Sequence, residues 1–449
     1  MTKARMDGLI LVFLGATVIV YLMGFLLKAT SSGAVEDFIA DYYSARCLVE
    51  HCDPYNENEV LRVYRAEGGE RPLTDPKDRA IATRYVYPPS AFAVMAPLAL
   101  LPWGLAHTLW MILSALSLIL AAGLAWDLGS RDAPLLAGLL VGYLLANSEV
   151  IVVLSNPSEL VISLCVIAVW CFLRDRFVLV GVVCLAVSLA LKPQDPGLIW
   201  LYFLLAGGVY RKRALLTLGV TAVIALPTLL WVWRVSPHWV SELHNNLLAF
   251  SVRGGLNDPG PASKVANEFV DLQVIVSRFI DQPTIYNPIS YLIFAPLFLA
   301  WLYVTLRTRV SPEKTTLAIA SIAALSLLPI HHHLYDTKLL LLTIPAFALV
   351  WVSGQRTRWV ALLLTGGALV VTGDLSGTIL FHVVGSLHPA PGGLAEWLVN
   401  AMMVFPSPLL LLATGVFYLW IYWRAAFSPK SPVADRIPTE APLRPEPAA

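Results

Sequence analysis

Apolar runs that are long enough to cross a lipid bilayer recur along the whole of this 449-residue chain. Because a crossing helix needs about 20 mostly apolar residues, each such run is a predicted membrane span. Only 14% of the residues are charged, whereas soluble domains carry about a quarter. The sequence therefore predicts an all-α polytopic membrane protein. It would have about 12 transmembrane helices, near residues 8–28, 104–126, 133–153, 157–173, 177–193, 196–210, 214–235, 288–306, 315–332, 336–353, 359–375 and 398–423.

The distribution of basic residues predicts which side of the membrane each connection faces. Lys and Arg collect in every second connection, at Lys3, Arg5, Arg131, Arg174, Arg176, Arg211, Lys212, Arg213, Arg307, Arg309, Arg356, Arg358, Arg424 and Lys430. Because basic loops stay in the cytoplasm, both termini are predicted to be cytoplasmic. This alternation requires the proline-bracketed stretch near 88–102 to be a re-entrant or interfacial segment instead of a span. Two large loops, 29–87 and 236–287, then face outward.

These assignments give one transmembrane domain over residues 1–426. The proline-rich tail, 427–449, is predicted to be disordered and cytoplasmic. Cys47 and Cys52 lie in the first outer loop and could pair if that loop faces an oxidising compartment, a question that their spacing leaves open. Lys and Arg (31) nearly balance Asp and Glu (30), so no nucleic-acid partner is expected.

Four polar clusters lie where predicted spans meet the outer face. They are Glu36, Asp37 and Asp41 after the first span, residues 156–159, residues 192–195, and His331, His332 and His333 with Tyr335 and Asp336. Ionisable groups at membrane depth are costly and therefore mark candidate functional sites. We predict that these clusters meet at one leaflet boundary.

Each cluster also has a simpler explanation. Lys192 could extend to the outer headgroups. Asp37 and Asp41 could be solvated loop charges, although their spacing of one helical turn also lets both face a cleft. The histidine run could be an ordinary polar loop or a metal site. Three consecutive histidines on a helix cannot all face one ion, so we expect no metal.

The residue types suit chemistry on a phosphate carried by a lipid. A carboxylate can act as a general base toward a hydroxyl group, and Lys or His at a bilayer surface can bind phosphate. The sequence contains no Walker loop and no G-x-G-x-x-G after a predicted strand, so a nucleotide site is not indicated. We expect no cofactor.

Short motifs follow one another in a characteristic order. They are Asp37-Phe38 with Tyr42 and Ala45, Asp53-Pro54-Tyr55, Tyr87-Pro88-Pro89, Pro97-Leu98, Leu101-Pro102, Lys192-Pro193 and the segment from His332 to Asp336. In these motifs the chain resembles glycosyltransferase family 87, whose GT-C-fold members include bacterial mannosyltransferases. It departs from the family at Ser155-Asn156-Pro157, where members often carry Gly-Gln.

The resemblance implies inverting transfer of a sugar from a polyprenyl-phosphate donor to a lipid or glycan acceptor. The reaction would take place on the extracytoplasmic face of a bacterial inner membrane. Mannose is the commonest sugar in the family, and arabinose or another pentose fits the same skeleton. Carried over by position, Asp37 is the general base and Asp41 is the second candidate.

The departing lipid phosphate needs positive or hydrogen-bonding partners because its charge grows as the glycosidic bond breaks. The resemblance assigns this role to Lys192 and to one of His331, His332 or His333. The residues expected to line the substrate pocket are Tyr42, Tyr87, Asn156, Gln194, Tyr335 and Asp336.

Two other functions are compatible with a chain of this kind. A flippase for lipid-linked sugars, or another transporter, would need a polar path through both leaflets and often has repeated halves. Here the polar residues gather at the outer ends of the spans, and no repeat is evident. A non-catalytic scaffold would leave Asp37 and Lys192 without a purpose, so the transferase is favoured.

Overall fold

A computed structural model describes residues 3–29, 36–69, 73–263, 265–386 and 393–427. Within these residues the regular structure is helical, and the one pairing of extended segments is an isolated antiparallel bridge between Phe269 and His333. The prediction of an all-α protein is therefore confirmed. The tail that we expected to be disordered lies outside the described residues, except for Phe427 at the end of the last helix.

Six segments of the described chain are long and apolar enough to cross a membrane. They are α1 (Lys3–Ala29), α6 (Trp103–Ser130), α12 (Gly208–Val235), α15 (Pro283–Arg307), the 3₁₀ helix η3 (Leu334–Thr343) continued by α17 (Ile344–Val352), and α21 (Pro406–Phe427). The helices α18 (Thr357–Val371) and α19 (Asp374–Gly385) are bent by 74° and make a seventh if the pair is one broken span. The chain is therefore a multi-pass membrane protein.

Shorter helices complete the bundle. They are α7 (Pro134–Ala146), α8 (Glu149–Leu154), α9 (Ser158–Arg174), α10 (Val178–Leu191), α11 (Gly197–Ala206), α16 (Pro312–Leu325) and α20 (Leu394–Val404). At 1.5 Å per residue, even the 17 residues of α9 extend only about 26 Å, less than the roughly 30 Å of a hydrocarbon core. Most of these helices lie where spans were predicted, but the count of about 12 spans is not confirmed.

Two predicted spans are interrupted at residues that favour a break. The span expected at 133–153 ends at Asn147, whose side-chain Oδ1 accepts hydrogen bonds from the backbone N–H groups of Leu375 and Ser376 at 3.2 and 3.3 Å. The span expected at 398–423 is divided at Phe405, because Pro406 begins a new helix.

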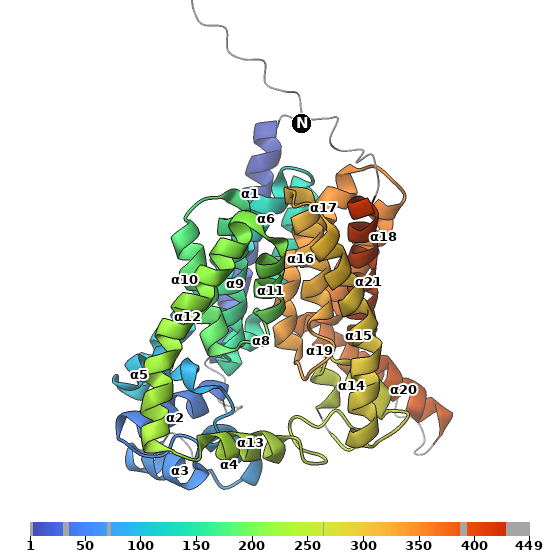
Figure 1. Cartoon of the computed structure of the whole chain (residues 1–449). Helices are drawn as coiled ribbons and strands as arrows, with labels where there is room; N and C mark the ends of the chain where they lie inside the picture. The colour runs from blue at the N-terminus through green and yellow to red at the C-terminus, as the bar shows by residue number, and fades with distance from the viewer. Residues whose placement is uncertain (1–2, 30–35, 70–72, 264, 387–392, 428–449) are drawn as a thin grey trace, which may run out of the picture.

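A lobe of short helices covers the end of the bundle opposite the N-terminus (Figure 1). It contains α2 (Asp37–Val49), α3 (Glu57–Ala66), α4 (Pro76–Thr83), η1 (Pro89–Ala91) and α5 (Phe92–Ala99), and it includes the Cys47–Cys52 disulfide. The eight residues of α5 cannot cross a bilayer. The stretch near 88–102 is therefore not a span in this structure.

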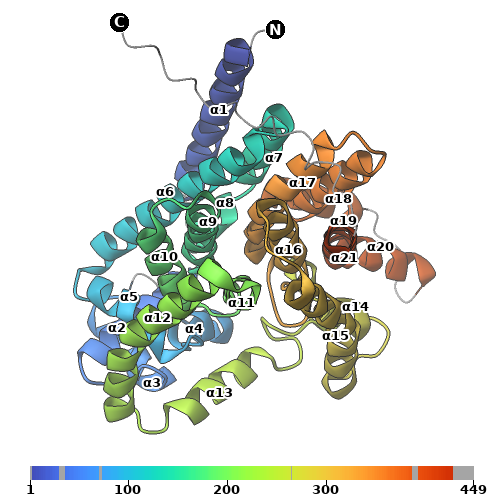
Figure 2. The same ribbon diagram turned by 45° about the horizontal axis from the view of Figure 1, so that its top comes forward.

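The second large loop runs along the same end of the molecule. It contains α13 (Trp239–Phe250), η2 (Ala266–Glu268) and α14 (Leu272–Ser277), and α13 extends from the α2–α4 side toward α14 (Figures 1 and 2). The side-chain Nδ2 of Asn246 on α13 donates to the backbone oxygens of Tyr55 and Tyr85 at 3.0 and 3.1 Å. These bonds fix α13 to the lobe.

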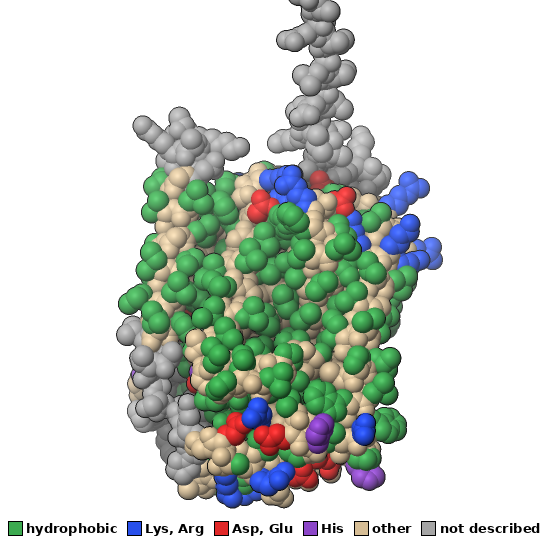
Figure 3. All heavy atoms as spheres, turned by 90° about the vertical axis from the view of Figure 1, so that its left-hand side faces the viewer, with side chains coloured by type: hydrophobic (Ala, Val, Ile, Leu, Met, Phe, Trp, Pro, Cys, Tyr) green, Lys and Arg blue, Asp and Glu red, His purple; other side chains and the backbone are tan. Residues whose placement is uncertain are grey.

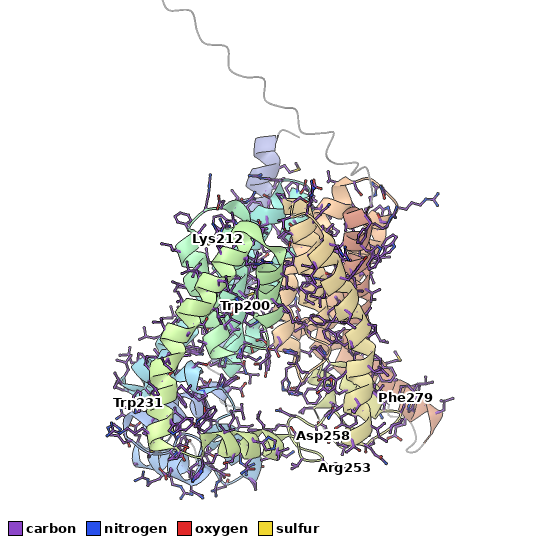
Figure 4. All side chains as sticks on the ribbon, viewed as in Figure 1. Trp200, Lys212, Trp231, Arg253, Asp258 and Phe279 are labelled. Atoms are coloured by element: carbon purple, nitrogen blue, oxygen red, sulfur yellow. A yellow bond between two sulfur atoms is a disulfide. The ribbon has the colours of Figure 1, made fainter. Side chains whose placement is uncertain are left out.

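The surface shows the polarity expected of a membrane protein. In Figure 3 an apolar band separates Lys and Arg side chains, with some acidic ones among them, at the end near the N-terminus from acidic, basic and histidine side chains at the lobe end. Figure 4 places Lys212 at the first end and Arg253 and Asp258 at the second. The lobe has its own apolar core, which includes Phe38 and Trp110 and reaches α9 and α10. This core holds α2 against the bundle.

Candidate active site

The proposed base lies at the first residue of a firmly packed helix. Asp37 begins α2 and is half-buried. The next residue, Phe38, is fully buried, and its ring stacks on Trp110 with ring centroids 5.1 Å apart. The packing of Phe38 in the lobe core holds the start of α2, where Asp37 lies, against the bundle. Its Oδ2 accepts a hydrogen bond from Asn156 Nδ2 at 2.6 Å.

Asn156 belongs to a tight turn between α8 and α9. Ser155 adopts a left-handed backbone with φ of 54°, which costs a non-glycine residue energy, and its carbonyl accepts a hydrogen bond from Trp110 Nε1 at 2.9 Å. The side-chain Oδ1 of Asn156 accepts from Ser158 N at 2.9 Å and from Ser158 Oγ at 2.7 Å. The amide of Asn156 is thereby directed at Asp37.

Lys192 is the first residue after α10, and its side chain extends into the same space. A residue before proline is disfavoured in a helical conformation, so Pro193 ends the helix at this point. The Lys192 Nζ donates to Ser158 Oγ and to Asp336 Oδ1, both at 2.6 Å, and lies 3.2 Å from Asp195 Oδ2. Lys192 is only 5% exposed. It therefore does not extend to the headgroups as a surface lysine does.

The histidine run leads directly into η3 and holds Asp336 in place. Asp336 Oδ2 accepts from the backbone N–H of His333 at 3.1 Å and lies 3.0 Å from His332 Nδ1. The N–H of Val270 donates to the carbonyl of His332 at 3.1 Å, next to the bridge between Phe269 and His333. The loop after α13 is thus hydrogen-bonded to the histidine run.

The three histidines do not share one environment. His332 is 1% exposed and faces Asp336 and Asp195, with Nδ1 3.5 Å from Asp195 Oδ1. His331 and His333 point their Nε2 atoms at each other at 3.1 Å, and the side chain of His331 is 32% exposed. The solvent-facing part of the run is therefore the His331–His333 pair.

Hydrogen bonds connect all four of the polar clusters that were predicted from the sequence. The chain of contacts, which we call the polar chain, runs from Asp37 through Asn156, Ser158, Lys192 and Asp336 to His332. Tyr335 adjoins it, because Lys192 Nζ lies 5.6 Å from its ring centroid. Gln194 is half-buried in the turn after Lys192.

Asp41, Tyr42 and Tyr87 are placed differently. Asp41 is 1% exposed, and its Oδ2 has no hydrogen-bond partner among the described residues. The hydroxyl of Tyr42 donates to the carbonyl of Leu101 at 2.7 Å, so it ties α2 to the turn before α6. Tyr87 is half-buried, and the carboxylates of Asp41 and Asp37 add to burial in raising the pKa of its phenol.

The surroundings raise the pKa of Asp37, but they leave it below neutral pH. Burial raises the pKa to about 6, and the hydrogen bond from Asn156 and the charge of Lys192 act in the opposite direction. Burial and the charge of Asp37 raise the pKa of Asp41 well above its usual value. With a pKa of about 6, Asp37 is largely ionised at neutral pH, whereas Asp41 is shifted toward its protonated form.

The phosphate-binding candidates also differ in charge. Burial lowers the pKa of Lys192, but the carboxylates of Asp195 and Asp336 more than offset this and raise it. Burial lowers the pKa of His333 to about 4 and that of His331 well below its usual value. The site therefore presents one ammonium and two neutral imidazoles.

The sequence analysis gave no role to two residues that complete the cluster. Asp195 lies three residues after Lys192, a spacing that allows contact across one turn, and both its oxygens lack a hydrogen bond within the described chain. Ser158 joins Asn156 to Lys192 through one hydroxyl. The sequence placed Ser158 in the polar cluster at 156–159, but nothing in the sequence alone indicated that its hydroxyl contacts both Asn156 and Lys192.

A set of metal-ligand side chains is present, although we expected no metal. Asp195, His332 and Asp336 have ligand atoms within 4.8 Å of one another. The ammonium of Lys192 lies within 3.2 Å of both carboxylates, so it already supplies a positive charge at this position. A metal ion would have to displace it.

A comparison with protein-family models supplies the family. The model of glycosyltransferase family 87 matches residues 85–329, which is more than half of the chain. The chain belongs to glycosyltransferase family 87. It is therefore a membrane glycosyltransferase, and the resemblance seen in the sequence is confirmed. Comparison with curated proteins returned no match.

The match covers only part of the polar chain. It contains Tyr87-Pro88-Pro89, Asn156 and Lys192, but Asp37 and Asp336 lie outside it. Their placement beside Asn156 and Lys192 is a property of the three-dimensional structure. Hydrogen bonds, and not the family match, therefore link Asp37 and Asp336 to the matched residues.

The ion pair between Lys192 and Asp336 gives a stability prediction. Replacing Lys192 by Met leaves the two buried carboxylates without their cation, which we expect to cost about 3–5 kcal/mol of unfolding free energy. Adding Asp336→Asn should restore part of this loss, because one uncompensated charge is then removed. Thermal unfolding in detergent measures both effects.

Lys77→Met is a suitable control because Lys77 is an exposed residue of α4, and its unfolding midpoint should not change. If the double variant Lys192→Met/Asp336→Asn is as unstable as the sum of the two single variants, the pair makes no buried interaction and the geometry above is wrong.

Proposed function

We propose that this glycosyltransferase moves a sugar, with mannose the first choice, from a polyprenyl-phosphate donor to a hydroxyl of a lipid or glycan acceptor. The observation that carries the proposal is the polar chain, which puts a half-buried carboxylate and a buried ammonium at one end of an apolar helix bundle. A water-insoluble donor with a phosphate at its polar end fits such a boundary. Family membership supports the reaction type.

Asp37 is the general base in this proposal. Its Oδ2 is held by Asn156, and no hydrogen bond to its Oδ1 is made by another described residue. As Oδ1 takes the proton of the acceptor hydroxyl, the acceptor oxygen attacks the anomeric carbon. The bond from that carbon to the phosphate oxygen breaks, the electron pair leaves with the lipid phosphate, and the configuration inverts.

The leaving phosphate is assigned to Lys192 and to the His331–His333 pair. The side chain of His331 is 32% exposed, and a neutral imidazole can donate its N–H to a phosphate oxygen. His332 is buried against Asp336 and has the separate role of orienting that carboxylate. Lys192 adds a charge that favours the phosphate as its own charge grows.

We assign the lobe end of the molecule to the extracytoplasmic side of a bacterial inner membrane. The basic connections lie at the opposite end, as in cytoplasmic loops (Figure 3). The Cys47–Cys52 disulfide is in the lobe, and disulfides persist mainly in oxidising compartments. Both termini are then cytoplasmic, and the reaction takes place at the outer leaflet.

The base assignment predicts a sharp difference between two neighbouring carboxylates. Membranes with Asp37→Asn should transfer radiolabelled mannose from polyprenyl-phosphate-mannose to a lipid-extract acceptor about 10²–10⁴-fold more slowly than wild type. Asp41→Asn should retain most of the rate, because Asp41 is buried outside the polar chain and its raised pKa disfavours the ionised form. Glycolipid formation is followed by chromatography.

The opposite pattern, with transfer lost in Asp41→Asn and kept in Asp37→Asn, moves the base to Asp41. If wild type transfers no label from mannose, arabinose or other pentose donors, the polyprenyl-phosphate donor is wrong. Movement of the donor across a vesicle membrane without transfer would support a flippase.

The pKa of Asp37 predicts the acidic side of the pH–rate profile. The base works only when it is ionised, so kcat/KM should fall about tenfold per pH unit below about pH 6. Above that pH the limb should be flat until another group titrates. A limb near pH 4 would show that the base is a solvated carboxylate and not Asp37 in this setting.

The sidedness can be tested with single cysteine substitutions at the two ends. Ala66 is exposed at the end of α3 in the lobe, and Lys212 is exposed near the start of α12 at the opposite end (Figure 4). A membrane-impermeant maleimide should label Ala66→Cys in intact cells and Lys212→Cys only after permeabilisation. The reverse labelling would place the site in the cytoplasm.

A further inference from the structure

We propose that Asn156 is a positioning residue for Asp37, and that Ser158 couples it to Lys192. The inference rests on the function proposed above for Asp37. It changes the role of Asn156, which the sequence analysis expected only to line the substrate pocket. In place of a contact with substrate, the geometry gives it a contact with the base.

The orientation of the Asn156 amide is fixed by its neighbours. The backbone N–H of Ser158 can only donate a hydrogen bond, and it lies 2.9 Å from Asn156 Oδ1. The oxygen of the amide must therefore face Ser158, and the NH₂ group must face Asp37. A flipped amide would place two donors against each other at Ser158 and two acceptors against each other at Asp37.

The direction of each remaining hydrogen bond is fixed as well. The ammonium of Lys192 has no lone pair, so it donates to Ser158 Oγ. The single hydroxyl proton of Ser158 is then directed to Asn156 Oδ1 at 2.7 Å. The positive charge of Lys192 polarises the hydroxyl and the amide in turn, which strengthens the hydrogen bond donated to Asp37.

This arrangement does two things for a base. It holds Oδ2 of Asp37, which leaves Oδ1 for the acceptor hydroxyl. It also favours the ionised form of Asp37 against burial. The charged and titratable groups that act electrostatically with Asp37 are Glu36, Asp41, Tyr87, Lys192, Glu268, Tyr335 and Asp336. Several of these groups are acidic and repel the carboxylate of Asp37. The hydrogen bond donated by Asn156 offsets part of this repulsion.

The test compares pH–rate profiles of variants in the full-length protein. Asn156→Ala removes the donor to Asp37, so the acidic limb of kcat/KM should move upward by about one pH unit, and kcat should fall. Ser158→Ala keeps the backbone N–H bond to Asn156 and removes only the hydroxyl. It should move the limb in the same direction by less, and it serves as the test if Asn156→Ala does not fold.

Ser163→Ala is a matched control. Ser163 is a fully buried serine of the same helix α9, and its Oγ has no hydrogen-bond partner among the described residues. Its acidic limb should remain at the wild-type pH. An Asn156→Ala or Ser158→Ala enzyme that is less active but keeps the wild-type limb has a structural defect only, and that result overturns the inference.

A double variant separates this inference from the proposed function. In an Asp37→Asn background, Asn156→Ala should lower the residual rate by less than about twofold, because a residue that acts through the base has nothing left to act on. If the rate losses of the two single variants multiply in the double variant, Asn156 acts on a group other than Asp37. If Asp37→Asn alone keeps its activity, the proposed function is wrong about the base, independently of Asn156.

Discussion

The burial of charge at the lobe end of the bundle determines how the rest of this molecule is arranged. Lys192 is only 5% exposed, and a buried ammonium is stable only when it is hydrogen-bonded or ion-paired. Its partners are Ser158, Asp195 and Asp336. These partners lie on α9, on the turn directly after α10, and on η3, so one charge joins the α9–α10 region to Asp336, which is 144 residues away from Lys192 in the sequence. The lobe is joined to the same cluster through Asn156 and Asp37.

The sequence indicated candidate site residues where a charged side chain lies in or next to an apolar run, because placing a charge there costs free energy. Charged residues at the ends of apolar runs pointed to Asp37, Lys192 and Asp336, and the structure places them in one polar chain. The family motifs pointed to the glycosyltransferase, which the family match confirms. The prolines that bracket the stretch near 88–102, Pro88, Pro89 and Pro102, indicated that it does not form a span, and its helix α5 has only eight residues.

Other features depend on contacts that a linear pattern does not contain. Hydropathy overestimated the length of several helices, because a buried segment needs only apolar neighbours and not 20 residues; α11, for example, has only 10 residues. Asn147 interrupts a predicted span by capping a helix more than 200 residues away. The bridging position of Ser158 between Asn156 and Lys192 is visible only in the structure. The spacing of Cys47 and Cys52 left their pairing open, and the fold of the lobe brings them together.

The amide in the polar chain has a consequence for the fate of the proton. An Asn side chain conveys the influence of a charge, but it cannot accept a proton at its NH₂ group and pass it on, because that nitrogen has no available lone pair. A proton taken up by Asp37 is therefore barred from travelling through Asn156 to Ser158 and Lys192. In the proposed mechanism, it leaves by the face through which the acceptor entered, so Asp37 is deprotonated again only when water reaches it after the glycosylated product departs. Regeneration of the proposed base is thus tied to the exit of the product.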